Sequence, residues 1–84
     1  MSESKDDFKF KITKEIGILS ERTARGYRKE LNLVSWNDRP AKLDIRDWTE
    51  EHVKMSRGVT LSGAEARVML ELLSEYDLDS IGEG

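Results

Sequence analysis

The sequence feature that most restricts the fold is a two-residue alternation of apolar and polar side chains. In FKFKITKEIGIL, residues 8–19, aromatic and aliphatic residues alternate with lysines and a threonine, which is the period of a strand with one buried face. Gly17 inside this run predicts a bulge or a bend. In KLDIRDW, residues 42–48, Leu43 and Ile45 alternate with charged residues in the same way. Both segments are therefore predicted to be strands.

Two further segments favour strands. Residues 27–37, YRKELNLVSWN, follow a polar loop that ends at Gly26. A strand is favoured here, although propensity leaves open a helix through the RKEL part. NDRPA, residues 37–41, has the composition of a turn, and GVTLS, residues 58–62, is a short β-branched run after a flexible glycine. The chain is therefore expected to contain four strands.

The clearest helical signal follows the fourth expected strand. Ser62 and Glu65 form the S-x-x-E capping box, in which the hydroxyl and the carboxylate each accept a hydrogen bond from a backbone amide at the start of a helix. Apolar residues then recur on one broad stripe. A helix is predicted from about Gly63 to Tyr76.

Four strands and one helix predict an α+β fold with a four-stranded antiparallel sheet, because the connections between strands are short. One helix covers only one face of such a sheet. The helix also carries more apolar surface than a small sheet covers, since Leu70 lies beyond the stripe that contains Met69 and Leu72. Such extra apolar surface is usually buried in a self-complementary interface between two copies of a chain, so a homodimer is predicted.

The 84 residues are enough for one small domain, and they include no cysteine. That composition excludes thiol catalysis and thiolate metal sites, and it fits a reducing compartment. No apolar run is long enough to span a bilayer and the N-terminus has no signal-peptide core, so a cytoplasmic protein without a membrane partner is expected. Residues 1–7 are predicted to be a disordered tail, residues 8–77 the domain, and residues 78–84 an acidic flexible tail.

The formal net charge of −3 conceals an uneven distribution. Residues 8–57 carry twelve Lys and Arg against eight Asp and Glu, whereas residues 58–84 carry one against six. The chain is therefore expected to present a basic surface and a separate acidic surface. The basic one is a candidate for contact with nucleic acid.

No catalytic or metal-binding set is recognisable in the sequence. The single histidine, His52, lies beside Glu50 and Glu51 in a polar connection and is expected to be a solvated loop residue. One histidine offers too few nitrogen ligands for a metal site, and the chain has no phosphate-binding glycine loop or nucleophile motif. A protein that is not an enzyme, with no cofactor and no small-molecule substrate, is expected.

The tryptophans suggest a function. By alternation, Trp48 lies on the opposite side from the aliphatic residues of its strand, together with Lys42 and Arg46. An exposed ring among cations suits single-stranded nucleic acid, because cations neutralise phosphates and the ring stacks on an unpaired base for about 1 to 3 kcal/mol. Alternation alone leaves open whether Trp48 is exposed. It also leaves open whether Trp36, which shares a side with Val34, is a core residue.

Three segments carry a resemblance to a known family: LVSWN at residues 33–37, LDIRDW at residues 43–48, and KMSRGVTLS at residues 54–62 before the final helix. They resemble the C-terminal domain of the transcriptional positive cofactor four family, most closely its small bacterial YdbC-like branch. The resemblance covers nearly all of residues 8–77. It implies a curved four-stranded sheet with a C-terminal helix, assembled as a homodimer that binds single-stranded DNA without strong sequence preference.

The resemblance also implies roles for individual residues. Arg46 would pair with phosphate, Trp48 would occupy the aromatic stacking position, and Lys54 and Arg57 would be loop cations. The sequence itself also suggests that Gly58, next to Arg57, lets the backbone approach a phosphate closely. The full set of candidate nucleic-acid-binding residues combines cations, aromatic residues and one amide: Lys42, Arg46, Trp48, Lys54, Arg57, Arg28, Lys29, Trp36, Asn37 and Arg39.

The expected function is non-enzymatic binding of single-stranded DNA, with RNA as an open alternative, in transcription, replication or repair. In a bacterium such a protein would be associated with the nucleoid. The alternative is a protein-interaction module of the transcription machinery, which uses Trp48 or the acidic helix face. Salt dependence separates the two, because counterion release from nucleic acid makes affinity fall steeply with salt.

Overall fold

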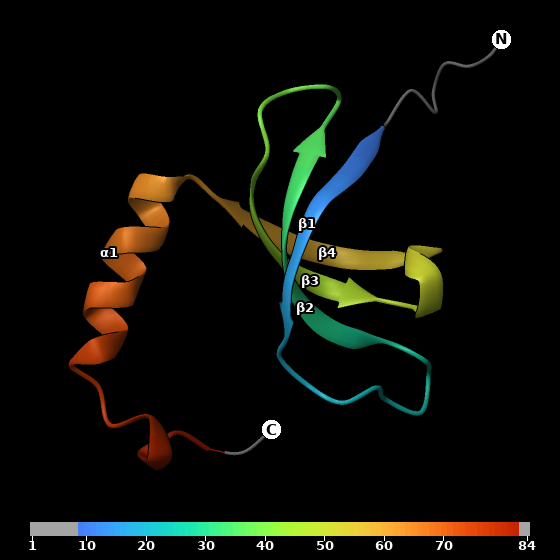
Figure 1. The fold of residues 1–84 in the computed structure, drawn as a ribbon. Coiled ribbons are helices and arrows are strands. Elements are labelled where there is room, and N and C mark those ends of the chain that lie inside the picture. The colour runs from blue at the N-terminus through green and yellow to red at the C-terminus, as the bar shows by residue number, and fades with distance from the viewer. Residues whose placement is uncertain (1–8, 83–84) are drawn as a thin grey trace, which may run out of the picture.

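A computed structural model of the chain describes residues 9–82. Four strands and one helix appear in the order β1 (Phe10–Ile18), β2 (Arg28–Trp36), β3 (Lys42–Trp48), β4 (Met55–Leu61) and α1 (Gly63–Ser74). Two short 3-10 helices are also present, η2 (Glu50–His52) and η3 (Leu78–Ser80). The strands form one antiparallel sheet in the order β1-β2-β3-β4 (Figure 1). The predicted four-stranded sheet followed by a helix is therefore confirmed, and the RKEL segment belongs to a strand.

The largest differences from the predicted boundaries are at the start of β4 and the end of α1. Strand β4 begins at Met55, three residues before the expected start, so most of the KMSRG segment pairs with β3. Helix α1 ends at Ser74 rather than Tyr76. The short helix η3 lies inside the predicted C-terminal tail, whereas the predicted tail at residues 1–7 lies outside the described residues.

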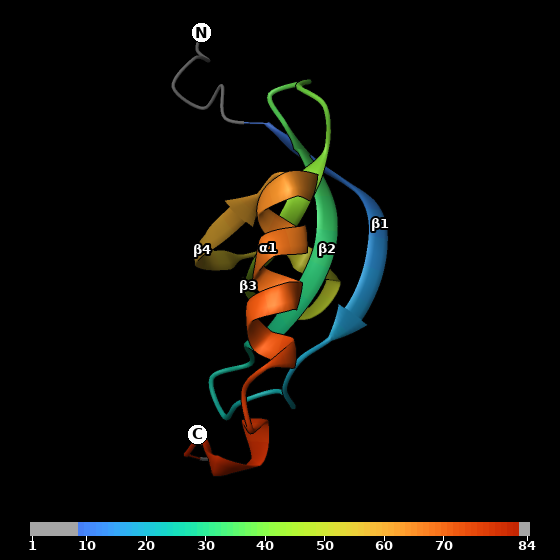
Figure 2. The same ribbon diagram turned by 90° about the vertical axis from the view of Figure 1, so that its left-hand side faces the viewer.

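Helix α1 begins as the sequence predicts. The Glu65 amide donates to the Ser62 hydroxyl at 3.1 Å, and the Ser62 amide donates to the Glu65 carboxylate at 2.8 Å, so each side chain satisfies one backbone group. The helix lies on the convex side of the sheet (Figures 1 and 2). No α1 residue is buried, and Leu70 and Leu72 are 65% and 63% exposed.

The sheet is strongly curved, and its fully buried side chains lie on the concave face. Val34 and Trp48 are 0% exposed. Trp36 and Trp48 occupy opposite ends of the paired strands β2 and β3, yet the Phe10 ring lies 5.9 Å from the first and 5.2 Å from the second. The sheet must curl for one phenyl ring to contact both. Two irregularities in β1, one of them around Gly17 as predicted, permit this bend.

Candidate nucleic-acid interface

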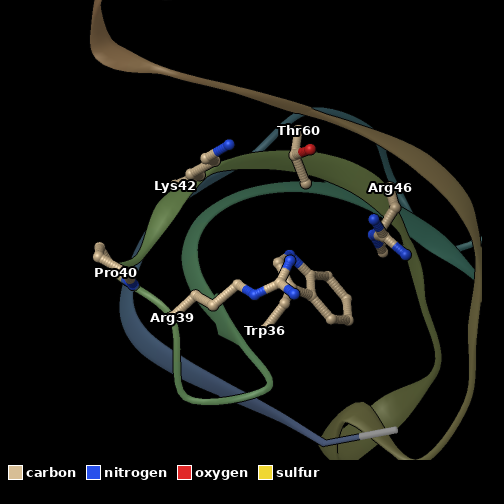
Figure 3. A pocket seen from close by; sticks show the side chains of 6 residues that line it. All are labelled: Trp36, Arg39, Pro40, Lys42, Arg46 and Thr60. Carbon is tan, nitrogen blue, oxygen red and sulfur yellow. The ribbon is translucent and has the colours of Figure 1, made fainter.

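A pocket with a volume of about 350 Å³ lies on the concave face. Its lining, hereafter the Trp36 pocket, combines an indole, three cations, a proline and a threonine: Trp36, Arg39, Pro40, Lys42, Arg46 and Thr60 (Figure 3). These side chains come from the end of β2, the following turn, β3 and β4. No carboxylate belongs to the lining. The pocket brings together four of the sequence-predicted residues.

The turn that carries Arg39 is set by its first two residues. Asn37 and Asp38 have φ values of 52° and 65°, a left-handed conformation that these residue types tolerate better than most. The Asn37 side chain accepts a hydrogen bond from the Lys9 amide at 2.9 Å, and the Ser35 hydroxyl donates to the Arg39 carbonyl at 2.6 Å. The Asn37 side chain therefore joins the turn to β1 and does not line the pocket.

Arg46 is held in a defined position in the pocket wall. Its Nε and Nη2 donate to the two carboxylate oxygens of Asp44 at 2.7 and 2.8 Å, a bidentate geometry that fixes the guanidinium plane. The guanidinium carbon lies 4.5 Å from the centre of the Trp36 ring, within the range of a cation–π contact. Asp44 is 0% exposed and the Arg46 side chain 12%. The cation thus forms a layer on the indole.

The structure does not expose the Trp48 ring, to which the resemblance assigns the aromatic stacking position. Trp48 shares the concave face with Lys42 and Arg46, as alternation predicts, but it is 0% exposed. Phe10 from β1 covers it, and the His52 ring meets it edge-on at 4.9 Å. Its indole Nε1 has no hydrogen-bond partner within residues 9–82. Trp36, which is half-buried, is the tryptophan that lines the pocket.

His52 is not a solvated loop residue, contrary to expectation. Glu51 and His52 both have left-handed φ values, 58° and 57°, and these turn the η2 segment back toward β2. His52 Nε2 lies 2.8 Å from Glu30 Oε1, and its side chain is only 22% exposed. Glu30 also accepts hydrogen bonds from Arg28 at 2.9 Å and from Asn32 at 3.2 Å.

A row of buried polar side chains on the concave face was missed from sequence. Glu30, Asn32 and Asp44 are 4%, 1% and 0% exposed, and each is held by hydrogen bonds or ion pairs. The available signal was their spacing: Glu30 and Asn32 are separated by multiples of two residues from Val34 and Trp36 along β2, and Asp44 is two residues from Arg46 along β3. It places all of them on one face, but polar residues at such positions normally indicate solvent.

The remaining predicted cations lie away from the Trp36 pocket. Arg28 is on the concave face but pairs with Glu30 at the far end of β2. Lys29 pairs with Asp47 at 3.1 Å on the opposite face. Lys54 and Arg57 are exposed in η2–β4 and β4. Their predicted contacts with nucleic acid therefore need a path that extends beyond the pocket.

Gly58 allows strand β4 to pack closely against β3. A Cβ atom at this position would overlap the Arg46 Cβ and the Ile45 carbonyl oxygen. Glycine is thus needed for β4 to lie against β3 beside Arg46. Gly58→Ala is expected to lower the free energy of unfolding by about 1 to 3 kcal/mol, measured by urea denaturation. Gly63→Ala is the matched control, because a Cβ there meets nothing within 4 Å; equal stability of both variants would contradict this role.

Glu30 links stability to pH. Burial raises its pKa, but the hydrogen bonds from His52, Arg28 and Asn32 outweigh burial and hold the pKa below its ordinary value. A lowered pKa in the folded state stabilises the protein above the pKa of the unfolded state, and this contribution is lost as pH falls through the folded-state pKa.

Glu30→Gln is therefore expected to lower the free energy of unfolding at pH 7 by about 1 to 3 kcal/mol. It should also make the loss of stability between about pH 5 and pH 3 less steep than in the wild type. Urea denaturation across that pH range measures both effects. Glu21→Gln, in an exposed loop, should retain the wild-type slope; an unchanged slope in Glu30→Gln would exclude this role.

Two classes of site have no counterpart in residues 9–82. No group of three or more His, Cys, Asp or Glu residues in this range is placed to hold a metal ion. Within the same range, no helix has the length and apolar character needed to cross a membrane.

Comparison with known proteins identifies the family. The family described as Transcriptional Coactivator p15 (PC4) matches residues 24–72, which include β2, β3, β4 and the whole Trp36 pocket. An uncharacterized protein of Treponema pallidum (strain Nichols) is 43% identical over 74 residues, which are 88% of this chain and 86% of the relative. Such a match suits the small bacterial branch. The chain therefore belongs to the Transcriptional Coactivator p15 (PC4) family, and this membership indicates nucleic-acid binding or a transcription-cofactor role.

Proposed function

We propose that this protein is a non-enzymatic, largely sequence-independent binder of single-stranded DNA that acts through the Trp36 pocket. The observation that carries the proposal is the convergence of an indole and three cations on one concave pocket without a carboxylate in its lining. Cations neutralise phosphates, and flat side chains stack with bases of any sequence. Family membership supports a nucleic-acid ligand.

Different residues of the pocket are proposed to contact the phosphates and the bases. Arg39 and Lys42 are exposed, so a flexible phosphate backbone can reach them. The Trp36 indole forms the wall at the centre (Figure 3), and the Arg46 guanidinium carbon lies 4.5 Å from its ring centre. An unpaired base can enter a concave pocket and pack against this wall. A duplex keeps its base faces stacked inside, so single strands are preferred.

A homodimer is part of the proposal. The apolar stripe of α1 and Leu70 beyond it remain exposed in the single chain, with Val68, Leu70 and Leu72 between 54% and 65% exposed. A second copy would bury this stripe and bring two Trp36 pockets into one assembly. Sedimentation is expected to show a dimer at micromolar concentration. A monomer throughout that range would remove this part of the proposal.

The proposed setting is the bacterial cytoplasm and nucleoid, during transcription, replication or repair. Titration of labelled oligo-dT, oligo-rU and a matched duplex across a salt series tests the function. Oligo-dT should bind at least about tenfold more tightly than the duplex. Its log affinity should fall linearly with log salt, by about 0.7 for each phosphate neutralised. Equal affinity for duplex, or affinity independent of salt, would refute the proposal.

The protein-interaction alternative retains one supporting observation. Burial of Trp48 removes it as a contact for a protein partner, but the exposed apolar and acidic surface of α1 remains available. Under this alternative, the wild type does not bind oligo-dT, and Leu70→Glu abolishes binding to the protein partner. The titration above therefore decides between the two.

A further inference from the structure

An acidic residue, Asp44, lies directly behind the wall of the Trp36 pocket. Asp44 lies 0% exposed in β3, two residues before Arg46 on the same face. Both of its carboxylate oxygens accept hydrogen bonds from the Arg46 guanidinium, at 2.7 and 2.8 Å. A buried carboxylate near a nucleic-acid ligand repels phosphate, so simple electrostatics predicts that Asp44 weakens binding.

The geometry of Arg46 indicates the opposite effect. Its guanidinium is fixed on one edge by Asp44, lies 4.5 Å from the Trp36 ring centre on one face, and lines the pocket with the remainder. Its Nη1 lies 3.4 Å from the Ser56 carbonyl oxygen on β4. Phe10 contacts Trp36 as well, with its ring centre at 5.9 Å. The Arg46 side chain is 12% exposed, so the surface that this wall offers to a ligand is the open part of the guanidinium together with the part of the indole that lines the pocket.

We infer that Asp44 is a positioning residue, which holds the Arg46 guanidinium flat against Trp36 as the surface on which an unpaired base packs. This inference rests on the proposed function. Guanidinium planes stack with unpaired bases in nucleic-acid complexes, and a side chain that is already ordered loses less conformational entropy when the ligand binds. Lysine cannot replace arginine in this role, because an ammonium group offers neither the plane nor the bidentate geometry.

The test uses two probes, oligo-dT and an abasic oligodeoxynucleotide of the same length, which retains the phosphates but has no bases. Asp44→Asn is expected to weaken oligo-dT binding about tenfold, although it removes a negative charge, and to change abasic binding less than about twofold. Arg46→Lys should show the same selective loss. Asp44→Asn should have little further effect in the Arg46→Lys background, because the two residues act as one unit.

Asp47→Asn is the matched control, since it removes the same charge from the other face of the same strand. Its affinity for oligo-dT should stay the same or rise slightly. If Asp44→Asn does not fold, Arg46→Lys with the two probes still tests the base-packing role. Equal losses on both probes, or full oligo-dT affinity in both variants, would overturn the inference. Absence of wild-type oligo-dT binding would instead overturn the proposed function.

Discussion

Replacement of Trp48 with alanine is expected to lower the free energy of unfolding by about 3 to 5 kcal/mol. The ring is 0% exposed and packs between Phe10 and His52, so its removal leaves a cavity on the concave side of the sheet. A small domain has a total stability of only about 5 to 15 kcal/mol. The variant should therefore unfold at much lower urea concentration, as followed by far-ultraviolet circular dichroism.

Trp48→Phe separates packing from hydrogen bonding. The Trp48 indole Nε1 donates to no partner in the described part of the chain, so phenylalanine forfeits no hydrogen bond and retains most of the apolar contact. Its cost should be well below that of alanine. If Trp48→Ala is as stable as the wild type, the ring is not a core residue. The stacking role that the resemblance implies for Trp48 would then be favoured.

Replacement of Trp36 with alanine is expected to have its main effect on binding. Loss of one stacking ring costs about 1 to 3 kcal/mol, which corresponds to a decrease in oligo-dT affinity of about fivefold to 150-fold. The cost in stability should be smaller than that of Trp48→Ala, because Trp36 is only half-buried. Fluorescence anisotropy with labelled oligo-dT, at equal fractions of folded protein, measures the difference.

Intrinsic fluorescence gives an independent check, since the chain has only these two tryptophans. In Trp48→Phe, the emission that remains comes from Trp36 and should change when oligo-dT is added. In Trp36→Phe, the emission comes from the buried Trp48 and should change little. The reverse result would assign the base contact to Trp48 and contradict the Trp36 pocket.

Much of the fold is predictable from sequence because it depends on local patterns. The alternation in residues 42–48 identifies β3 and both of its faces, and the Ser62 and Glu65 pair marks the start of α1. Each signal arises within a few residues of the chain. The ends of the strands are less predictable from sequence. Strand β4 begins at Met55 because this segment pairs with β3, a contact between distant parts of the chain.

The site is less predictable because it depends on curvature. Alternation assigns Trp48 to a face, but whether that face is open depends on how far the sheet curls and on where Phe10 lies after the bulges of β1. The same limit applies to His52, whose contact with Glu30 needs two consecutive left-handed residues that propensity does not favour. Residue type and two-residue alternation therefore identify Arg46 as a candidate from sequence. Its pairing with Asp44 is visible only in the three-dimensional structure.

The contact of Phe10 with both tryptophans has a consequence for local opening. Strand β1 is an edge strand, and Phe10 lies at its first position. Edge elements open more readily than the whole domain unfolds. When β1 detaches, Phe10 leaves both tryptophans at the same time. The Trp48 indole N–H should then become accessible to solvent, and Trp36 loses its contact with the Phe10 ring. Hydrogen exchange at the Trp48 indole would therefore report how often the pocket loses its shape, and a single-stranded ligand that holds the pocket together should slow this exchange from a site that it never touches.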